Sequence, residues 1–255
     1  MLDAIGESGF RFVEIGTPPR HFDPWSDDQV KQVAECLRRS GIDAVSIHAP
    51  FGGILDLSDP NPQHQSAAIG GILQAAIALQ ALGGSIVVVH PTDVPRLDQD
   101  VEQRLETASH GLARLASAVG RMGMRLAVES PLPHLIGGDP AEFERILAQL
   151  DDSAGVCLDT GHVTLGKNWD RFVRIAGTRL LHVHANDHRG SFDDHLPPGD
   201  GILHWGEISE SLRRSAFAGH VILELSCPAG PVAEFLSRAR SSAQALLGDG
   251  GTQSA

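Results

Sequence analysis

Hydrophobic and polar positions follow a regular order along the chain: short runs rich in Val, Ile and Leu are separated by longer amphipathic segments. Seven such runs occur, at residues 10–16, 43–50, 85–91, 125–130, 155–162, 179–187 and 220–226. Runs that are apolar at nearly every position suit strands buried on both faces, so they predict a parallel sheet covered by helices. The pattern favours an α/β fold of the (β/α)₈ TIM-barrel type over an open doubly wound sheet, since no G-x-G-x-x-G motif follows the first run.

The segments between the runs carry signals for helix starts. Ser26 precedes Gln29 by three residues, and Asp139 and Pro140 place Glu142 at the third helical position. The apolar residues that share one face of the second of these helices are Phe143, Ile146, Leu147 and Leu150. Both segments are therefore predicted to be helices that cover the sheet.

One strand of an eight-stranded barrel is missing from this pattern. The chain opens in a helix-like segment, "LDAIGES", so the first strand is absent here or lies upstream of Met1. The unpaired edges of the first and last runs predict either a poorly soluble protein or a homo-oligomer associated along this seam, unless an upstream strand fills it. No linker divides the chain, which predicts one domain over residues 1–247 and a disordered tail over 248–255.

Composition limits the partners and the compartment. The 255 residues are 42% hydrophobic, and the net charge of -12 disfavours nucleic acid, although bound metal ions would offset part of it. Three separated cysteines without a C-x-x-C pair fit a reducing compartment. With no signal peptide and no apolar run near membrane-spanning length, the sequence predicts a cytoplasmic protein without a membrane partner.

Six consecutive predicted strands end in a residue type that binds metal ions. These residues are His48, His90, Glu129, Asp159, His184 and Glu224. In a parallel barrel all these ends meet at the C-terminal rim, so the side chains converge on one pocket. Three carboxylates in a pore without a cation would each cost several kcal/mol in desolvation. The set therefore predicts a divalent metal ion, Mn²⁺ or Zn²⁺, because it mixes carboxylates with imidazoles.

The loop after the sixth run adds further ligand types. Residues 182–201 hold four histidines and four aspartates, among them Asp193 and His195, and His162 follows Asp159 by three residues. His182 shares strand parity with His184 but lies one layer deeper, so His184 is predicted to be the ligand and His182 a core histidine.

Other loop residues are candidates for substrate contacts. Arg189 could hold a substrate hydroxyl, carboxylate or phosphate, with a solvated loop arginine as the alternative. Trp25 lies in a predicted rim loop, as do Phe22 and Phe51, and such rings stack on the C–H faces of sugars. Trp205 is predicted to pack under its own loop.

The motifs "ESP", "LDTGH", "HVHAND", "DDHLPPGDG" and "LEL" occur in this order. Together they resemble the xylose isomerase-like barrel superfamily, which holds sugar isomerases and epimerases and the endonuclease IV repair enzymes. The resemblance covers about residues 10–228. In the ketose 3-epimerase branch it implies one metal ion on Glu129, Asp159, His184 and Glu224, with His162 near the substrate oxygens. In the endonuclease IV branch it implies three ions, with the additional ligands His48, His90, His162, Asp193 and His195.

These observations predict a divalent-metal-dependent isomerase or epimerase acting on a sugar, a sugar phosphate or a cyclic polyol. Glu129 and Glu224 are the predicted catalytic pair, one removing a proton beside a carbonyl and the other returning it. His162, Arg189 and Trp25 are the predicted substrate contacts. The alternative is an endonuclease IV-like enzyme that cleaves abasic DNA at a three-metal site.

Two observations disfavour the alternatives. The predicted rim loops at 49–59 and 90–98 hold one arginine between them, where a DNA binder needs several phosphate contacts. A barrel that only binds a ligand has no physical reason to keep paired buried charges at every strand end.

Overall fold

The computed structural model describes residues 1–17, 22–96, 100–227 and 229–247. It contains all seven predicted strands, which pair in parallel in chain order within one sheet. The strands are β1 (Phe12–Gly16), β2 (Asp43–His48), β3 (Ile86–Val89), β4 (Arg125–Glu129), β5 (Ala154–Asp159), β6 (Leu180–Ala185) and β7 (His220–Leu223). The predicted disordered tail, 248–255, lies outside the described residues.

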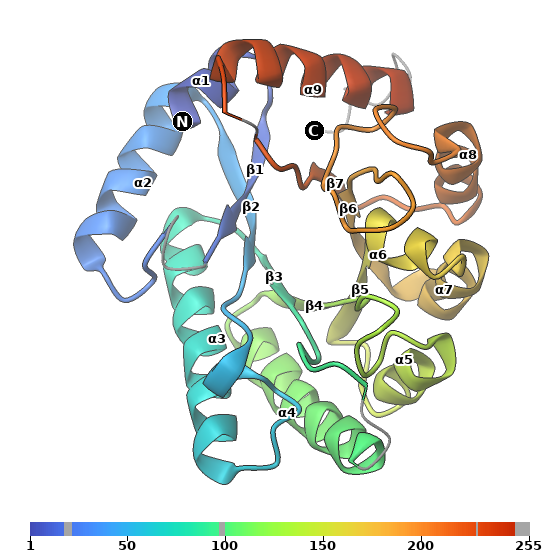
Figure 1. Ribbon diagram of the computed structural model, residues 1–255. Coiled ribbons are helices and arrows are strands. Elements are labelled where there is room, and N and C mark those ends of the chain that lie inside the picture. The colour runs from blue at the N-terminus through green and yellow to red at the C-terminus, as the bar shows by residue number, and fades with distance from the viewer. Residues whose placement is uncertain (18–21, 97–99, 228, 248–255) are drawn as a thin grey trace.

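The sheet curls into a nearly closed barrel surrounded by a ring of helices (Figure 1). The helices are α1 (Leu2–Glu7), α2 (Asp27–Ser40), α3 (Pro62–Leu82), α4 (Val101–Arg121), α5 (Pro140–Leu147), α6 (Thr160–Leu165), α7 (Trp169–Ala176), α8 (Trp205–Arg214) and α9 (Val232–Leu247), with the short 3₁₀ turns η1 (Gly53–Leu55) and η2 (Gly177–Arg179). This arrangement confirms the predicted α/β barrel.

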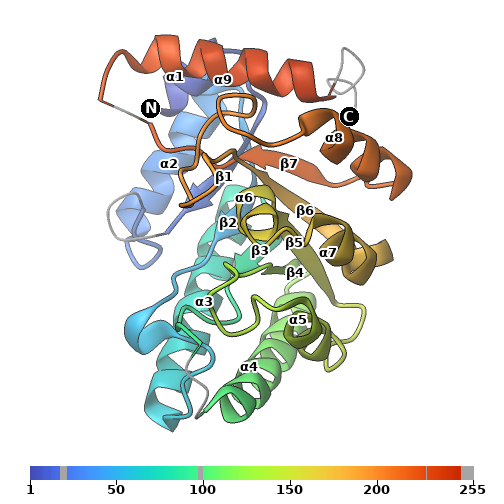
Figure 2. The ribbon, with the colours of Figure 1, turned by 45° about the vertical axis from the view of Figure 1, so that its right-hand side comes forward.

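A seam separates the two edge strands, β1 and β7, which do not pair with each other among the described residues. The rings of Phe12 and His220 meet across it with centroids 5.2 Å apart. Outside the seam, α1 lies beside α9 (Figures 1 and 2), and the Arg240 guanidinium donates to the Gly9 carbonyl. Side-chain contacts and helices therefore close the barrel where the predicted missing strand leaves no backbone ladder.

The predicted helix starts are confirmed by their capping contacts. The Ser26 hydroxyl accepts a hydrogen bond from the Gln29 amide at 3.3 Å. The Asp139 carboxylate accepts from the Ala141 amide at 2.8 Å, with Pro140 in the first turn of α5. The four apolar residues predicted for one face of this helix are buried, although Leu150 lies just beyond the end of α5, and the helix packs beside α4 and α7.

One helix differs from the expectation that no apolar segment reaches membrane-spanning length. By length and composition alone, α3 is long and apolar enough to cross a membrane. In the barrel it packs between α2 and α4 and against β2 and β3 (Figure 1). Its residues Ala68, Ile72, Ala75 and Leu79 are buried. A helix that faces the sheet and two neighbouring helices is apolar on most of its sides, which explains its composition.

Side chains fill the interior of the barrel below the carboxyl ends of its strands. A cluster of buried side chains from β3, β4 and β5 lies within the ring of strands, consisting of Ile86, Val88, Ala127 and Cys157. Because successive side chains of a strand point to opposite faces, the next inward-facing positions are the strand ends. Those ends carry the predicted metal-ligand residues. Because the barrel interior below them is packed with side chains, a ligand site can form only at the rim.

Candidate functional site

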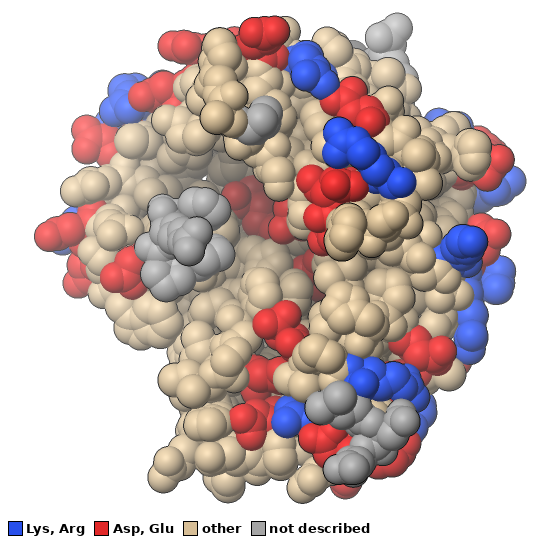
Figure 3. All heavy atoms as spheres, in the orientation of Figure 1, with Lys and Arg blue, Asp and Glu red and all other residues tan. Residues whose placement is uncertain are grey.

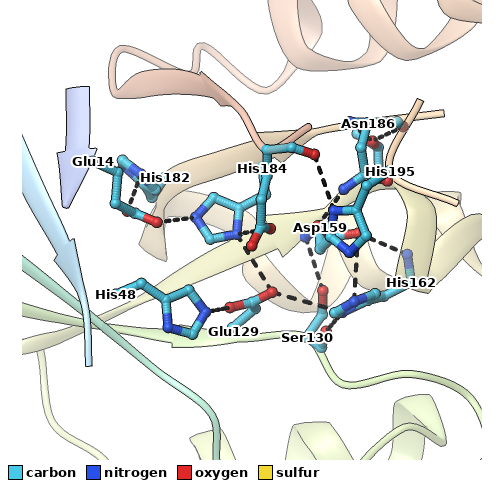
Figure 4. Close-up of polar contacts among 12 residues, drawn as sticks. Glu14, His48, Glu129, Ser130, Asp159, His162, His182, His184, Asn186 and His195 are labelled. Carbon is cyan, nitrogen blue, oxygen red and sulfur yellow. Dashed lines mark hydrogen bonds and ion pairs between the residues drawn. The ribbon is translucent and has the colours of Figure 1, made fainter. Parts of the chain in front are cut away.

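The rim at the carboxyl ends of the strands brings the predicted side chains together. Figure 3 shows a hollow in this face with acidic side chains inside it, and Figure 4 shows the strand-end residues pointing toward one another. Within the described part of the chain, four groups of His, Asp and Glu side chains have ligand atoms within 4.8 Å of one another. Three of these groups are made of residues singled out from the sequence, and the fourth contains Glu14.

Glu129 lies at the centre of the site, 1% exposed. One of its oxygens, Oε2, is 3.1 Å from His48 Nε2 and 3.2 Å from His90 Nε2. The other oxygen, Oε1, is 3.4 Å from His184 Nδ1 and 3.7 Å from His162 Nδ1. A single carboxylate at the end of β4 thus faces imidazoles on both sides and joins two of the groups.

The group with the most carboxylates contains Glu129, Asp159, His184 and Glu224. Asp159 is fully buried, and its oxygens are held by the Asn186 side-chain amide at 2.7 Å and the His162 backbone amide at 2.7 Å. Glu224 Oε2 lies 3.0 Å from His184 Nδ1. Three acidic groups so close together, two of them buried and Glu224 half-buried, need compensating positive charge.

A second set of ligand types lies on the side of the loop after β6. Asp193 Oδ2 is 3.1 Å from His162 Nε2 and 2.9 Å from His195 Nε2. The backbone of His195 adopts φ 49°, in the left-handed region that costs energy for a residue with a Cβ. Strain of this kind is concentrated at functional sites, where surrounding contacts hold it in place.

Three histidine rings are oriented in the same way. The Nδ1 atoms of His48, His162 and His195 face the backbone carbonyls of Ala49, Ser130 and Glu224 at 3.2, 2.9 and 3.0 Å. A proton on Nδ1 satisfies that carbonyl and leaves the Nε2 lone pair directed at the carboxylates. Metal-binding histidines are commonly fixed by such contacts, so these rings are ready to act as ligands.

The loop that carries Asp193 and His195 is held by one buried side chain, Asp187. Its carboxylate accepts from the backbone amides of His188, Gly199 and Leu203 and from Trp205 Nε1, at 2.8, 3.0, 3.2 and 2.8 Å respectively. Trp205 therefore packs beneath this loop, as predicted.

Burial and neighbouring charges shift the pKa values of several side chains in the site. Burial alone would lower the pKa of His48, but the adjoining Glu129 carboxylate raises it to about 9. Burial likewise opposes protonation of His162 and His195, yet Asp159 and Asp193 raise the pKa of His162 to about 10, and Asp193 raises the pKa of His195 to about 9. Burial raises the pKa of Asp159 to about 6, helped by its neighbours Glu129 and Glu224. Without an ion, protons on the imidazoles therefore balance the carboxylates.

This balance predicts a pH-dependent stability for the metal-free protein. The folded-state pKa values of His48, His162 and His195 lie above the ordinary value of 6.5, so the folded state binds these protons more tightly. Their stabilisation is complete below pH 6.5 and is lost as the pH rises through about 9 to 10. We expect the Tm in the presence of a chelator to fall over that range, and His48→Gln to flatten the curve. A Tm that rises between pH 6.5 and 9 would contradict this assignment.

Two predicted substrate contacts do not point at the metal-ligand groups. The Arg189 side chain is 67% exposed and lies 3.5 Å from Asp194. Trp25 is 56% exposed, and its ring lies beside Gly71 of α3. Phe51 does reach the site, because its ring stacks on His90 with centroids 4.0 Å apart. The rim loops have no hydrophobic periodicity, so the sequence could not indicate these directions.

One side chain of the site, Glu14, was not predicted. It lies in the middle of β1 and contacts His182 and His184. It belongs to the layer below the rim, so the pattern of residues at the strand ends does not indicate it. A lone glutamate in the otherwise apolar strand sequence "FVEIG" is the available signal. His182 is fully buried in that layer, in keeping with its predicted place below His184.

Comparison with known proteins agrees with this geometry. The family described as "Xylose isomerase-like TIM barrel" matches residues 2–246. The chain belongs to this family. The solved structure of a D-tagatose 3-epimerase-like protein superposes with a TM-score of 0.82 at 25% identity, covering 94% of this chain and 88% of that one.

Curated relatives represent both branches of the family. A D-psicose 3-epimerase from Ruminiclostridium cellulolyticum is 26% identical over 233 residues, which cover 88% of this chain and 76% of that protein. A probable endonuclease 4 from Acholeplasma laidlawii is 25% identical over 209 residues, which cover 74% of this chain and 70% of that protein. Family membership and the sugar epimerases among its similar proteins support an enzyme of the isomerase and epimerase type.

Proposed function

We propose that the protein is a divalent-metal-dependent epimerase or isomerase of a small carbohydrate. The observation that carries the proposal is the group of Glu129, Asp159, His184 and Glu224, the first three buried and the last half-buried, at the carboxyl ends of four consecutive strands. The similarity of the chain to sugar epimerases over most of its length also supports the proposed epimerase or isomerase activity.

The donor atoms of this group suit a divalent cation. Three carboxylates and one imidazole form a ligand set of the kind that Mn²⁺ and Zn²⁺ accept. Glu224 Oε2 and both ring nitrogens of His184 are buried without an aligned hydrogen bond, although carboxylates or imidazole lie near each of them. Buried polar atoms left in this state are expected where an ion completes the site. When bound, such an ion polarises a substrate carbonyl and makes the neighbouring C–H more acidic.

Glu129 and Glu224 are the groups that would move the proton. They come from β4 and from the end of β7, with the His184 ring in contact with both. One carboxylate removes the proton from the carbon beside the carbonyl, and the other delivers a proton to the opposite face. Net transfer from one face to the other inverts that carbon, which is the outcome of an epimerisation.

The remaining predicted side chains differ in how near they lie to the proposed substrate. His162 Nε2 is directed into the site beside Asp193 and would meet a substrate hydroxyl. Phe51 and Trp25 supply aromatic surface in the rim loops after β2 and β1. Arg189 would approach the substrate only by leaving Asp194, and its exposure allows that movement.

A second candidate function is metal-dependent phosphodiester hydrolysis. The observation that favours it is the presence of two further groups beside the first: His48, His90 and Glu129 on one side, and His162, Asp193 and His195 on the other. The similarity to a probable endonuclease 4 points in the same direction. The net charge of -12 opposes binding to a polyanion.

The number of bound ions separates the two candidates. We expect the protein purified without chelator to hold about one tightly bound Mn²⁺ or Zn²⁺ per chain, because only one group among the described residues combines three carboxylates with an imidazole. Elemental analysis by mass spectrometry, before and after dialysis against a chelator, measures this number. About three ions per chain would favour the hydrolase, and none under any loading condition would contradict both candidates.

A further inference from the structure

Glu14 is the one acidic side chain that β1 directs into the barrel. Its Cα pairs in register with Ser46 of β2, and its side chain is 7% exposed. The residues that it contacts belong to β6, which is not a neighbour of β1 in the sheet. The carboxylate therefore crosses the interior on the side where the β1–β7 seam lacks backbone pairing.

The two oxygens of this carboxylate are divided between two imidazoles. Glu14 Oε2 accepts a hydrogen bond from His182 Nε2 at 3.1 Å, and Ser46 Oγ lies 3.4 Å from the same nitrogen. Glu14 Oε1 is 3.0 Å from His184 Nε2. Figure 4 shows Glu14 facing both rings, with His184 between Glu14 and the rest of the site.

This contact reverses the orientation of His184 relative to the other rings of the site. His48, His162 and His195 turn Nδ1 toward backbone carbonyls and Nε2 toward carboxylates. His184 has Nε2 beside Glu14, and its Nδ1 lies 3.4 Å from Glu129 and 3.0 Å from Glu224. The His184 nitrogen that faces away from Glu129 and Glu224, Nε2, contacts a carboxylate from the distant strand β1. The corresponding nitrogen of the other three rings contacts a backbone carbonyl.

We propose that Glu14 is a positioning residue that holds His184 with Nδ1 available as the metal ligand. A proton on Nε2 interacts with the Glu14 carboxylate, which fixes the ring plane and leaves the Nδ1 lone pair toward Glu129 and Glu224. A carboxylate behind a ligating imidazole also makes it a stronger donor. The inference rests on the ion of the proposed function but not on the reaction catalysed.

The test compares the affinity for Mn²⁺ and Zn²⁺ of three variants with that of the wild type. Glu14→Gln keeps the shape but loses the charge, and Glu14→Asp keeps the charge but withdraws it by one methylene. The matched control is Glu142→Gln, a buried glutamate outside the barrel interior that contacts Arg96 and the Gly137 amide. Each apo protein is first checked for folding by its Tm and circular dichroism, and its metal Kd is then measured by competition with a chelating dye.

We expect both Glu14 variants to bind the ion about 10- to 100-fold more weakly, the usual effect of removing such a partner, while Glu142→Gln binds as the wild type does. An unchanged Kd in folded Glu14→Gln and Glu14→Asp would overturn the inference. Loss of one whole ion, with the remaining affinity unchanged, would also overturn it, because Glu14, His182 and His184 would then form a metal site of their own. A wild type that binds no ion would instead refute the proposed function.

Discussion

Glu129→Gln is expected to release the proposed ion and to lower turnover by a factor on the order of 10³, because in the proposed mechanism the same carboxylate is both metal ligand and proton carrier. In the folded protein each oxygen of Glu129 faces imidazoles, with His48 and His90 on one side and His184 on the other. An amide supplies only one acceptor oxygen and places an NH₂ group on the opposite side. The variant therefore loses both the charge and one of the two acceptors.

Elemental analysis and steady-state kinetics on the same preparation test this expectation. Glu142→Gln is the control, since it removes a buried carboxylate that contacts Arg96 away from the rim. We expect the control to keep the ion and its turnover. If Glu129→Gln retained a full complement of metal, Glu129 would not be a ligand and the centre of the site would have to be assigned again.

Asp187→Ala is expected to destabilise the protein by about 3–5 kcal/mol, because it removes a buried carboxylate that accepts from four donors, one buried and three in partly buried hydrogen bonds. The fully buried carboxylate accepts four hydrogen bonds from the segment between His188 and Trp205. Gly201 approaches it so closely that a Cβ there would clash with its oxygen, which leaves little room for repacking. The loop that carries Asp193 and His195 would lose its anchor, so loss of activity should accompany loss of stability.

Chemical denaturation and metal analysis measure the two effects. Asp194→Ala is the matched control in the same loop, because that carboxylate contacts the amide and the exposed side chain of Arg189. We expect the control to change the free energy of unfolding by about 1 kcal/mol or less. Equal destabilisation by the two substitutions would show that Asp187 does not organise the loop.

The strands and the rim residues could be predicted because both follow from periodicity. Once the apolar runs were recognised as parallel strands, their ends had to meet at one face, and His48, Glu129 and Asp159 had to converge there. The structure brings them together as expected. The count of seven strands followed from the same runs.

The features that could not be predicted depend on contacts that follow no periodic pattern in the sequence. Three of the four donors to Asp187 are backbone amides, which any residue would offer, so nothing in the sequence marks these partners. Glu14 shares its layer with His182 through the stagger of the strands and the curvature of the sheet, which spacing along the chain does not give. The direction of Arg189 depends on Asp194, its partner in an irregular loop.

Exchange of substrate hydrogen with D₂O tests the proposed reaction most directly. The metal-loaded protein would be incubated with ketoses, ketose phosphates and inosose-type cyclic polyols, and with an oligonucleotide that contains one abasic site. We predict that one of the carbohydrates gains deuterium at the carbon beside its carbonyl, and that Glu129→Gln abolishes the exchange, because the proposed step breaks that C–H bond. Phosphodiester hydrolysis breaks no C–H bond. Metal-dependent cleavage of the oligonucleotide at the abasic site, lost in Glu129→Gln and without deuterium in any carbohydrate, would contradict the epimerase assignment.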